Sequence, residues 1–241
     1  MAIVDLHTHS TASDGSLSPA GLVALADESR LAAVALTDHD TVAGIPAARE
    51  AAAELPGLAF LAGIEISARF DGGTMHILGL DIDETSAGIA RLARTLRESR
   101  DERNPRILNK LREMGVDLDM DQVLAVASEG SGRADSGIVS RVHIAEAMLR
   151  TGAVRSVREA FEKYIGARGP AYVHKWRPAP QEGIEIIRES GGMAVLAHPV
   201  ELNCASLAQV ERIARDLMRH GLAGMEAWHS RHTPEQTRAY M

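Results

Sequence analysis

The chain has 241 residues, of which 45% are hydrophobic and 24% are charged, and its formal net charge is −7. This length fits one large domain, or one domain that carries an insert, and it can bury a core without a disulfide staple. The acidic balance argues against binding to long duplex nucleic acid, and no apolar run reaches the roughly 18 residues of a membrane span. The single cysteine, Cys204, excludes an intramolecular disulfide and is typical of a cytoplasmic protein.

Strand and helix patterns alternate along the first third of the chain. Strands are expected at residues 3–6, 32–37, 58–66 and 74–82, and helices at 18–29 and 45–54. Ser18 followed by Pro19 is a typical helix start, because serine caps free N–H groups and proline fits the first turn. This alternation indicates an α/β fold with a largely parallel sheet or barrel and helices packed outside it.

Helical periodicity replaces the strand pattern in the middle of the chain, over residues 84–168. We expect one long helix there, with a break near Pro105 left open, and two or three short helices. The α/β pattern then resumes, with strands at 193–197 and 224–228 and helices at 181–189, at 207–220 and from Thr233 onward. The interpretation is a barrel domain, residues 1–83 and 169–241, with residues 84–168 as a helical insert that caps it.

Histidines and carboxylates recur where the predicted strands end. They are His7, His9 and Asp14 after the first strand, His39 after the second, Glu65 on the third, His76 on the fourth and His198 after the fifth. Because the carboxyl ends of parallel strands meet on one face of a barrel, these side chains are expected to share one site. Such ligands suit Mn²⁺, Zn²⁺ or Fe²⁺, and a carboxylate such as Glu65 can bridge two ions. One histidine alone would more often be structural, but their joint placement predicts a metal site.

Five sequence motifs resemble those of a known family. They read DLHTHSTASDGSLSP (5–19), AVALTDHDTVAG (33–44), GIEIS (63–67), MHILG (75–79) and AVLAHPVE (194–201). In this order they are similar to the PHP (polymerase and histidinol phosphatase) family, and within it to stand-alone bacterial phosphoesterases that act on nucleotides. The resemblance implies a distorted (β/α)7 barrel with two to three divalent ions, most often manganese, with zinc or iron as alternatives. It implies the ligands His7, His9, Asp14, His39, Glu65, His76 and His198.

Relatives of this type carry a seventh strand with a Gly-Ser-Asp-Phe-His motif, whose aspartate and histidine complete the metal cluster. The 241 residues do not contain that motif and end inside the helix that starts near Pro234. We therefore expect a barrel without its seventh strand, and a cluster in which at least one ion is absent, weakly held or completed by water. His229 and His232, after the sixth predicted strand, are either replacements for these ligands or surface residues.

Substrate contacts are expected mainly from the insert, because residues 84–114 carry a charge of +3 in a chain of −7 and would attract anions. The expected substrate-binding residues are Arg100, Arg103, Asn104, Arg141, His143 and Lys175. The first three match a segment that borders the nucleotide in similar proteins. The next two resemble an Arg-Pro-His segment of the family at a helix N-terminus, which favours phosphate binding. Lys175 could instead be an exposed surface residue.

The predicted function is metal-dependent hydrolysis of a phosphomonoester, either on a small nucleotide such as a 3′,5′-bisphosphonucleotide or at the 5′ end of a short RNA. Asp40, beside His39, is expected to position substrate or to shuttle a proton, and His198 is expected to take part in catalysis. A histidinol-phosphate-type phosphatase would use the same cluster without an arginine-rich insert. A catalytically weak scaffold would bind one ion or none. The oligomeric state is left open.

Overall fold

The computed structural model describes residues 3–129 and 138–241, and a six-stranded sheet forms its centre. The strands are β1 (Val4–Thr8), β2 (Ala33–Leu36), β3 (Ala59–Ala68), β4 (Met75–Leu80), β5 (Met193–Leu196) and β6 (Gly224–Met225). Their order in the sheet is their order in the sequence. Strands β1, β2 and β3 are parallel, β4 is antiparallel to both β3 and β5, and β6 is parallel to β5.

Strand β4 runs opposite to the other five strands, so the sheet is largely parallel, as expected, with one reversed strand. Strand β3 ends at Ala68 and β4 begins at Met75, which leaves too few residues for the crossover of a dozen or more that parallel neighbours need. His76 is therefore at the start of its strand, not at the end, and it pairs in register with Ser67 near the end of β3. The reversed direction places His76 at the same edge of the sheet as the ends of β1 and β2.

The sheet is curled, so that its first and last strands approach each other at one edge. Glu226 directly follows β6, and its Oε1 lies 2.9 Å from Nδ1 of His7 on β1. Strand β6 is shorter than the expected 224–228, because the residues after Met225 turn toward this contact. The described residues supply six strands, and the expectation of a barrel without its seventh strand stays a prediction.

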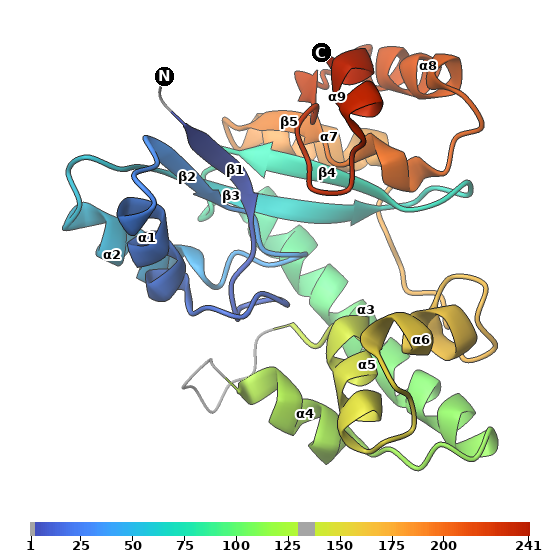
Figure 1. The fold of residues 1–241 in the computed structure, drawn as a ribbon. Coiled ribbons are helices and arrows are strands. Elements are labelled where there is room, and N and C mark those ends of the chain that lie inside the picture. The colour runs from blue at the N-terminus through green and yellow to red at the C-terminus, as the bar shows by residue number, and fades with distance from the viewer. Residues whose placement is uncertain (1–2, 130–137) are drawn as a thin grey trace.

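Helices cover the sheet and connect its strands (Figure 1). They are α1 (Pro19–Glu28), α2 (Ile45–Ala53), α7 (Pro180–Glu189), α8 (Leu207–Met218), α9 (Pro234–Tyr240) and the short 3-10 helix η2 (Pro199–Leu202). Helix α1 begins as predicted, since the Gly21 N–H donates to Oγ of Ser18 at 3.1 Å. The main core lies where α7 packs on β3, β4 and β5, around the fully buried Ile66, Ile77 and Ile184.

The expected insert is helical where it is described, and residues 130–137 of it lie outside the described residues. Its elements are α3 (Ala87–Glu113), α4 (Met120–Ser128), α5 (Arg141–Arg150), α6 (Val157–Ala160) and the π-helix η1 (Phe161–Ile165). Helix α3 continues through Pro105 without the break that was left open. Pro105 cannot donate to the carbonyl of Asp101, but Asp101 is exposed, so water can satisfy that group.

Helix α3 links two hydrophobic cores, and Figure 1 shows it running from the sheet to the group of α4, α5 and α6. Leu92 and Leu96 in its first half pack into the core of the sheet. Ile107 and Leu111 in its second half belong to a separate core with residues of α4, α5 and η1. Within residues 3–129 and 138–241, no helix combines the length and hydropathy needed to cross a membrane.

Candidate metal centre

Five histidines surround one buried carboxylate, that of Glu65 on β3, which is 1% exposed. The histidines are His7, His9, His39, His76 and His198. Oε2 of Glu65 lies 3.3 Å from Nε2 of His7, 3.2 Å from Nε2 of His9 and 2.9 Å from Nδ1 of His39. Oε1 of Glu65 lies 2.7 Å from Nδ1 of His76 and 2.8 Å from Nε2 of His198. Six of the seven predicted ligands therefore meet at one carboxyl group.

Asp14, the seventh predicted ligand, approaches from the loop after β1. Its Oδ1 lies 3.8 Å from Nδ1 of His9, and its Oδ2 lies 3.8 Å from Nε2 of His39. The buried carboxylate of Asp38 holds this loop, since the N–H and the hydroxyl of Ser10 donate to it at 2.7 and 2.6 Å. The loop thus presents Asp14 to the centre on a fixed backbone.

The backbone explains why ligands on or directly after five strands converge. His7 and His9 are two residues apart on an extended segment, so their side chains point to the same side. His39 forms an isolated parallel bridge with Glu65, directly after the end of β2. His198 follows β5 with a φ of 23°, a conformation that costs a residue other than glycine about 1–3 kcal/mol and that persists where the surroundings hold it.

Several buried polar atoms at the centre lack a hydrogen-bond partner, and a bound cation would satisfy them. Oε2 of Glu65 and Nδ1 of His39 lie 2.9 Å apart, yet both are buried without a hydrogen-bond partner. Nδ1 of His198 is buried in the same way. Buried polar atoms without partners are costly, and a shared cation removes that cost. Three groups of predicted ligands place their ligand atoms within 4.8 Å of one another: His7–His9–Glu65, His9–Asp14–His39 and His39–Glu65–His76.

The carboxylates make the centre attractive to positive charge. Burial lowers the pKa of His7, but hydrogen bonds to Glu226 and Glu65 outweigh it and raise that pKa to about 10. Burial likewise lowers the pKa of His39, but attraction to Glu65 outweighs it and raises that pKa to about 9. Burial dominates at His76, whose pKa falls to about 4. Burial raises the pKa of Glu65, yet His39 and His76 hold it well below its ordinary value.

Asp40 joins the metal centre to two cations of the neighbouring segments. It is fully buried. Its Oδ2 accepts hydrogen bonds from Nζ of Lys175 at 2.6 Å and from Nε of Arg100 at 3.0 Å. Its Oδ1 accepts a hydrogen bond from the N–H of Ser67 at 2.8 Å. Burial raises the pKa of Asp40, but Lys175 and Arg100 hold it well below its usual range. An aspartate kept ionised in this way favours positioning of the cations over proton transfer.

Arg103 and Asn104 lie on the same helix as Arg100 and are almost fully buried. Nε and Nη2 of Arg103 donate to Oδ1 of Asn104 at 3.1 and 2.7 Å, and Nδ2 of Asn104 donates to the carbonyl of Val139 at 3.1 Å. Burial lowers the pKa of Arg103, and repulsion from neighbouring guanidinium groups lowers it further. Asn104 therefore orients an arginine that has little countercharge.

Arg141 and His143 lie in the first turn of α5. The guanidinium of Arg141 stacks 5.3 Å from the ring of Tyr172 and donates to the carbonyl of Ile165 at 3.0 Å. Nδ1 of His143 accepts from the N–H of Ser140 at 3.2 Å and so caps the helix. This contact uses one of the two ring nitrogens of His143.

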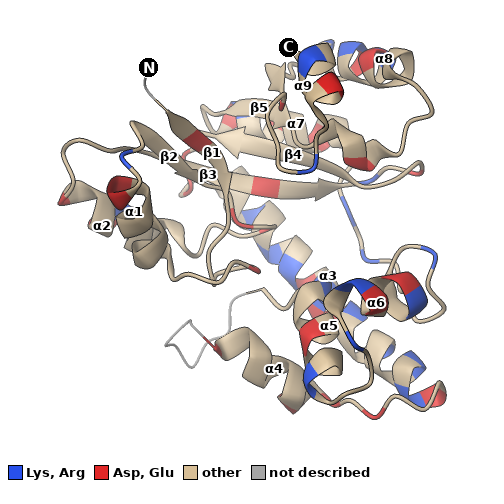
Figure 2. Ribbon diagram, viewed as in Figure 1, with Lys and Arg blue, Asp and Glu red and all other residues tan. Residues whose placement is uncertain are grey.

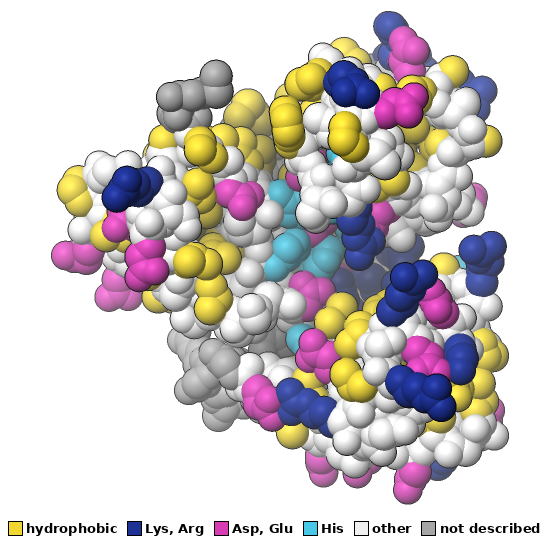
Figure 3. All heavy atoms as spheres, in the orientation of Figure 1, with side chains coloured by type: hydrophobic (Ala, Val, Ile, Leu, Met, Phe, Trp, Pro, Cys, Tyr) yellow, Lys and Arg dark blue, Asp and Glu magenta, His cyan; other side chains and the backbone are white. Residues whose placement is uncertain are grey.

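Arg177 completes a group that we name the cation cluster: Arg100, Arg103, Arg141, Lys175 and Arg177. Arg177 was not predicted from the sequence, and repulsion from it lowers the pKa of both Arg103 and Arg141, after the larger effect of burial. The five cations outnumber the one carboxylate of Asp40, which contacts Arg100 and Lys175. In Figure 3, histidine side chains lie on the floor of a hollow at the centre of this face, with lysine and arginine side chains next to them.

Comparison with known proteins agrees with this geometry. Residues 5–169 match the model of the PHP domain. The chain belongs to the PHP domain family. It is 37% identical to a 5′-3′ exoribonuclease of Haemophilus influenzae, over 92% of this chain and 77% of that protein. It is 34% identical to a 3′,5′-nucleoside bisphosphate phosphatase of Chromobacterium violaceum, over 97% and 79% of the two chains.

A solved PHP-like structure shares the fold over nearly the whole chain. The protein, from Bifidobacterium adolescentis, is inferred to be a metal-dependent phosphoesterase. The TM-score is 0.86 at 30% identity, and the match covers 99% of this chain and 82% of that one. The recognised family and its α/β fold are thereby confirmed.

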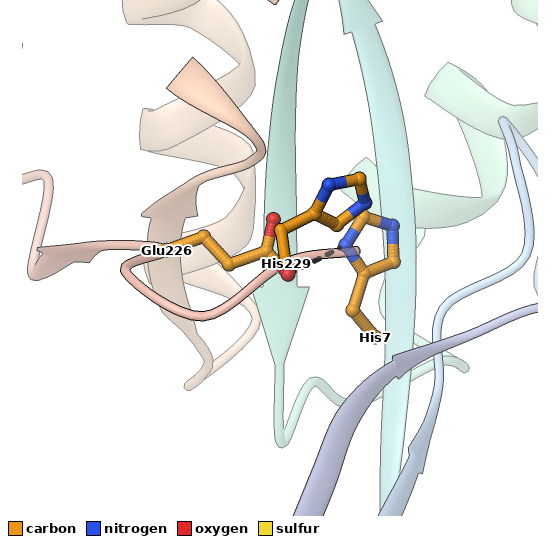
Figure 4. Close-up of side chains that lie close together, drawn as sticks. All are labelled: His7, Glu226 and His229. Atoms are coloured by element: carbon orange, nitrogen blue, oxygen red, sulfur yellow. Dashed lines mark hydrogen bonds and ion pairs between the residues drawn. The ribbon is translucent and has the colours of Figure 1, made fainter. Parts of the chain in front are cut away.

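Glu226 contacts two of the predicted ligands and was missed by the sequence analysis. Figure 4 shows Glu226 and His229, from the segment after β6, turned toward His7 of β1. Oε1 of Glu226 lies 2.9 Å from Nδ1 of His7, and Oε2 accepts from the N–H of His198 at 2.6 Å. The ring of His229 lies 5.9 Å from that of His7, so it faces the centre. The curl of the sheet brings these residues to β1, and no local sequence motif predicts this contact.

Proposed function

We propose that this chain is a metal-dependent phosphoesterase that hydrolyses either a phosphomonoester of a small nucleotide, such as a 3′,5′-bisphosphonucleotide, or the 5′ end of a short RNA. The observation that carries the proposal is the cation cluster beside the metal centre, with Asp40 between them. Buried cations in excess need an anion, and a substrate with a second phosphate supplies it next to the phosphate that reacts. The names of the relatives from H. influenzae and C. violaceum support this substrate class.

The seven residues assigned as ligands are His7, His9, Asp14, His39, Glu65, His76 and His198. We infer that they hold two to three divalent ions, with manganese as the resident metal and zinc or iron as the alternatives. Such ions polarise phosphoryl oxygens and lower the pKa of water when they are bound. Glu65 has the central position for a bridging carboxylate, because its two oxygens face different histidines. His198 is assigned to catalysis as well, since it lies against both Glu65 and His76.

The substrate-binding residues are assigned to two parts of the insert and to the segment after it. Arg100 and Lys175 are oriented by Asp40, and Arg103 is oriented by Asn104. Arg141 and His143 add the positive end of a ten-residue helix. In this arrangement residues 84–168 act as a cap, and residues 1–83 and 169–241 carry the metal site.

Phosphate release tests the proposal. The purified chain with Mn²⁺ is expected to hydrolyse adenosine 3′,5′-bisphosphate and 5′-phosphorylated short RNA, and a chelator is expected to abolish the reaction. Glu65→Gln removes the central charge and should abolish turnover, whereas Glu235→Gln, at an exposed position on α9, should not.

Two results would contradict it. A strong preference for histidinol phosphate would assign the histidinol-phosphatase alternative. One bound ion or none, with neither phosphate nor 5′-nucleotide released from any substrate, would assign a scaffold role.

A further inference from the structure

We propose that a pocket next to the cation cluster binds a second nucleotide, with its base stacked on Trp176, so that the site accepts oligonucleotides and not mononucleotides alone. The inference rests on the proposed function, because it extends the substrate that the metal centre would hydrolyse. It concerns residues outside the predicted site, apart from Lys175.

The pocket lies between the β3–β4 hairpin and the segment that connects η1 to α7. Its volume is about 800 Å³, and residues 69–73, 167–168, 172, 174–177 and 203 line it. Small-molecule sites commonly measure roughly 300–1,000 Å³. The pocket is therefore large enough for a nucleotide unit.

The lining is positively charged although the chain is acidic. Arg69, Arg168, Lys175 and Arg177 line the pocket together with one carboxylate, that of Asp71. Nε of Arg177 is buried and has no hydrogen-bond partner. Figure 2 shows Lys and Arg positions along the segment that leads to α7. A buried guanidinium N–H with no acceptor, in a cationic pocket, is suited to a phosphate oxygen.

Aromatic side chains are rare in this chain, yet they gather here. The sequence has two tryptophans, three tyrosines and three phenylalanines, and Phe70, Tyr172 and Trp176 line this one pocket. Tyr172 is covered on one face by Arg141, but Trp176 is 46% exposed. The N–H of Trp176 donates to Oγ of Ser99 at 2.7 Å, which fixes the backbone of this segment against α3. An exposed indole on an anchored backbone is a platform on which any base can stack.

Lys175 connects the pocket to the metal centre. It lines the pocket, and its Nζ contacts Asp40, the neighbour of His39 in the chain. Trp176 and Arg177 follow Lys175 directly in the chain and line the same pocket. A strand whose 5′ phosphate lies at the metal centre would pass Lys175 and place its next base on Trp176 and its next phosphate at Arg177.

The test compares two substrates in each variant with Mn²⁺ present. The readout is the ratio of kcat/KM for a 5′-phosphorylated adenosine trinucleotide to kcat/KM for adenosine 3′,5′-bisphosphate. Trp176→Ala should lower this ratio about 5- to 150-fold, which corresponds to about 1–3 kcal/mol of stacking. Trp176→Phe should restore most of it. The control is Trp228→Ala, because Trp228, the other tryptophan, is 76% exposed and does not line the pocket. This variant should leave the ratio unchanged, because any effect on the metal centre acts on both substrates.

A binding measurement keeps the inference testable without turnover. In Trp228→Phe protein, Trp176 is the sole tryptophan, and stacking of a base should quench its fluorescence when the trinucleotide is added with a chelator present. A ratio unchanged by Trp176→Ala, or fluorescence unchanged by the trinucleotide, would overturn the second-nucleotide site and leave the proposed function intact. Failure of both substrates to react, with quenching retained, would instead overturn the proposed function.

Discussion

Asp40→Asn removes a negative charge that two buried cations share, and it should destabilise the protein strongly. Asp40 is fully buried, and Lys175 and Arg100 both donate to its Oδ2 while the N–H of Ser67 donates to its Oδ1. Asparagine has the same shape but offers one oxygen and one NH₂ group. In either orientation the NH₂ group faces donors, so either Ser67 or the two cations lose an acceptor.

Breaking a buried ion pair by removing one partner costs about 3–5 kcal/mol, because the remaining charge stays buried. At about 2–4 °C per kcal/mol for a protein of this size, Tm should fall by roughly 6–20 °C. The loss also depends on pH. Burial lowers the pKa of Lys175, and repulsion from Arg100 lowers it further. Attraction to Asp40 raises it, but the pKa still falls to about 7. Above that pH Lys175 is neutral in both proteins, so the deficit should be larger at pH 6 than at pH 9.

Urea unfolding at pH 6 and pH 9, with a chelator present, measures this loss. The control is Asp216→Asn, which breaks the pair with Arg219 on the surface, where the side chain of Asp216 is 48% exposed. Surface pairs contribute about 0–1 kcal/mol. A loss at Asp40 no larger than that of the control, or a deficit that grows with pH, would refute the reasoning.

Three further predictions concern ligation and binding. Glu226→Gln should weaken the ion bound at His7 about 10- to 100-fold in competition with a chelating dye, because the carboxylate orients that ring, while Glu235→Gln should not. His7 and His39, with pKa values of about 10 and 9, are protonated at pH 7. Metal binding must displace these protons, so metal affinity should rise with pH up to about 10. Calorimetry in buffers of different ionisation enthalpy should detect the released protons, and binding without proton release would contradict this. Arg141→Ala should raise KM for a bisphosphonucleotide more than it lowers kcat, since contacts remote from the reacting phosphorus act on ground and transition states alike; a fall in kcat alone would place Arg141 at the reacting centre.

Short-range chemistry in the sequence predicted the elements that depend on neighbours in the chain. Helix α1 starts where Ser18 and Pro19 indicate, and the apolar run before Thr37 is a buried strand. The ordered motifs identified the family, and the histidines and carboxylates within them are the residues that the structure gathers around Glu65. A cap, a turn or a motif depends on a few adjacent residues, and so it can be recognised without the fold.

The direction of β4 was within reach of the sequence but was not predicted. Apolar periodicity is the same for a strand in either direction, so it carried no information on this point. The short connection containing Gly72 and Gly73 was the available signal, because it leaves no room for a crossover.

The partners of Asp40 and Glu226 were decided by the tertiary structure alone. Asp40 contacts Lys175 across 135 positions of the chain, and Glu226 contacts His7 across 219. Each contact depends on how the sheet curls and where α3 and the segment before α7 pack against it. The sequence by itself determined which residues carry the chemistry. The packing of distant segments decided which of them share a charge, because Coulomb and hydrogen-bond energies depend on distances in space that residue spacing along the chain does not specify.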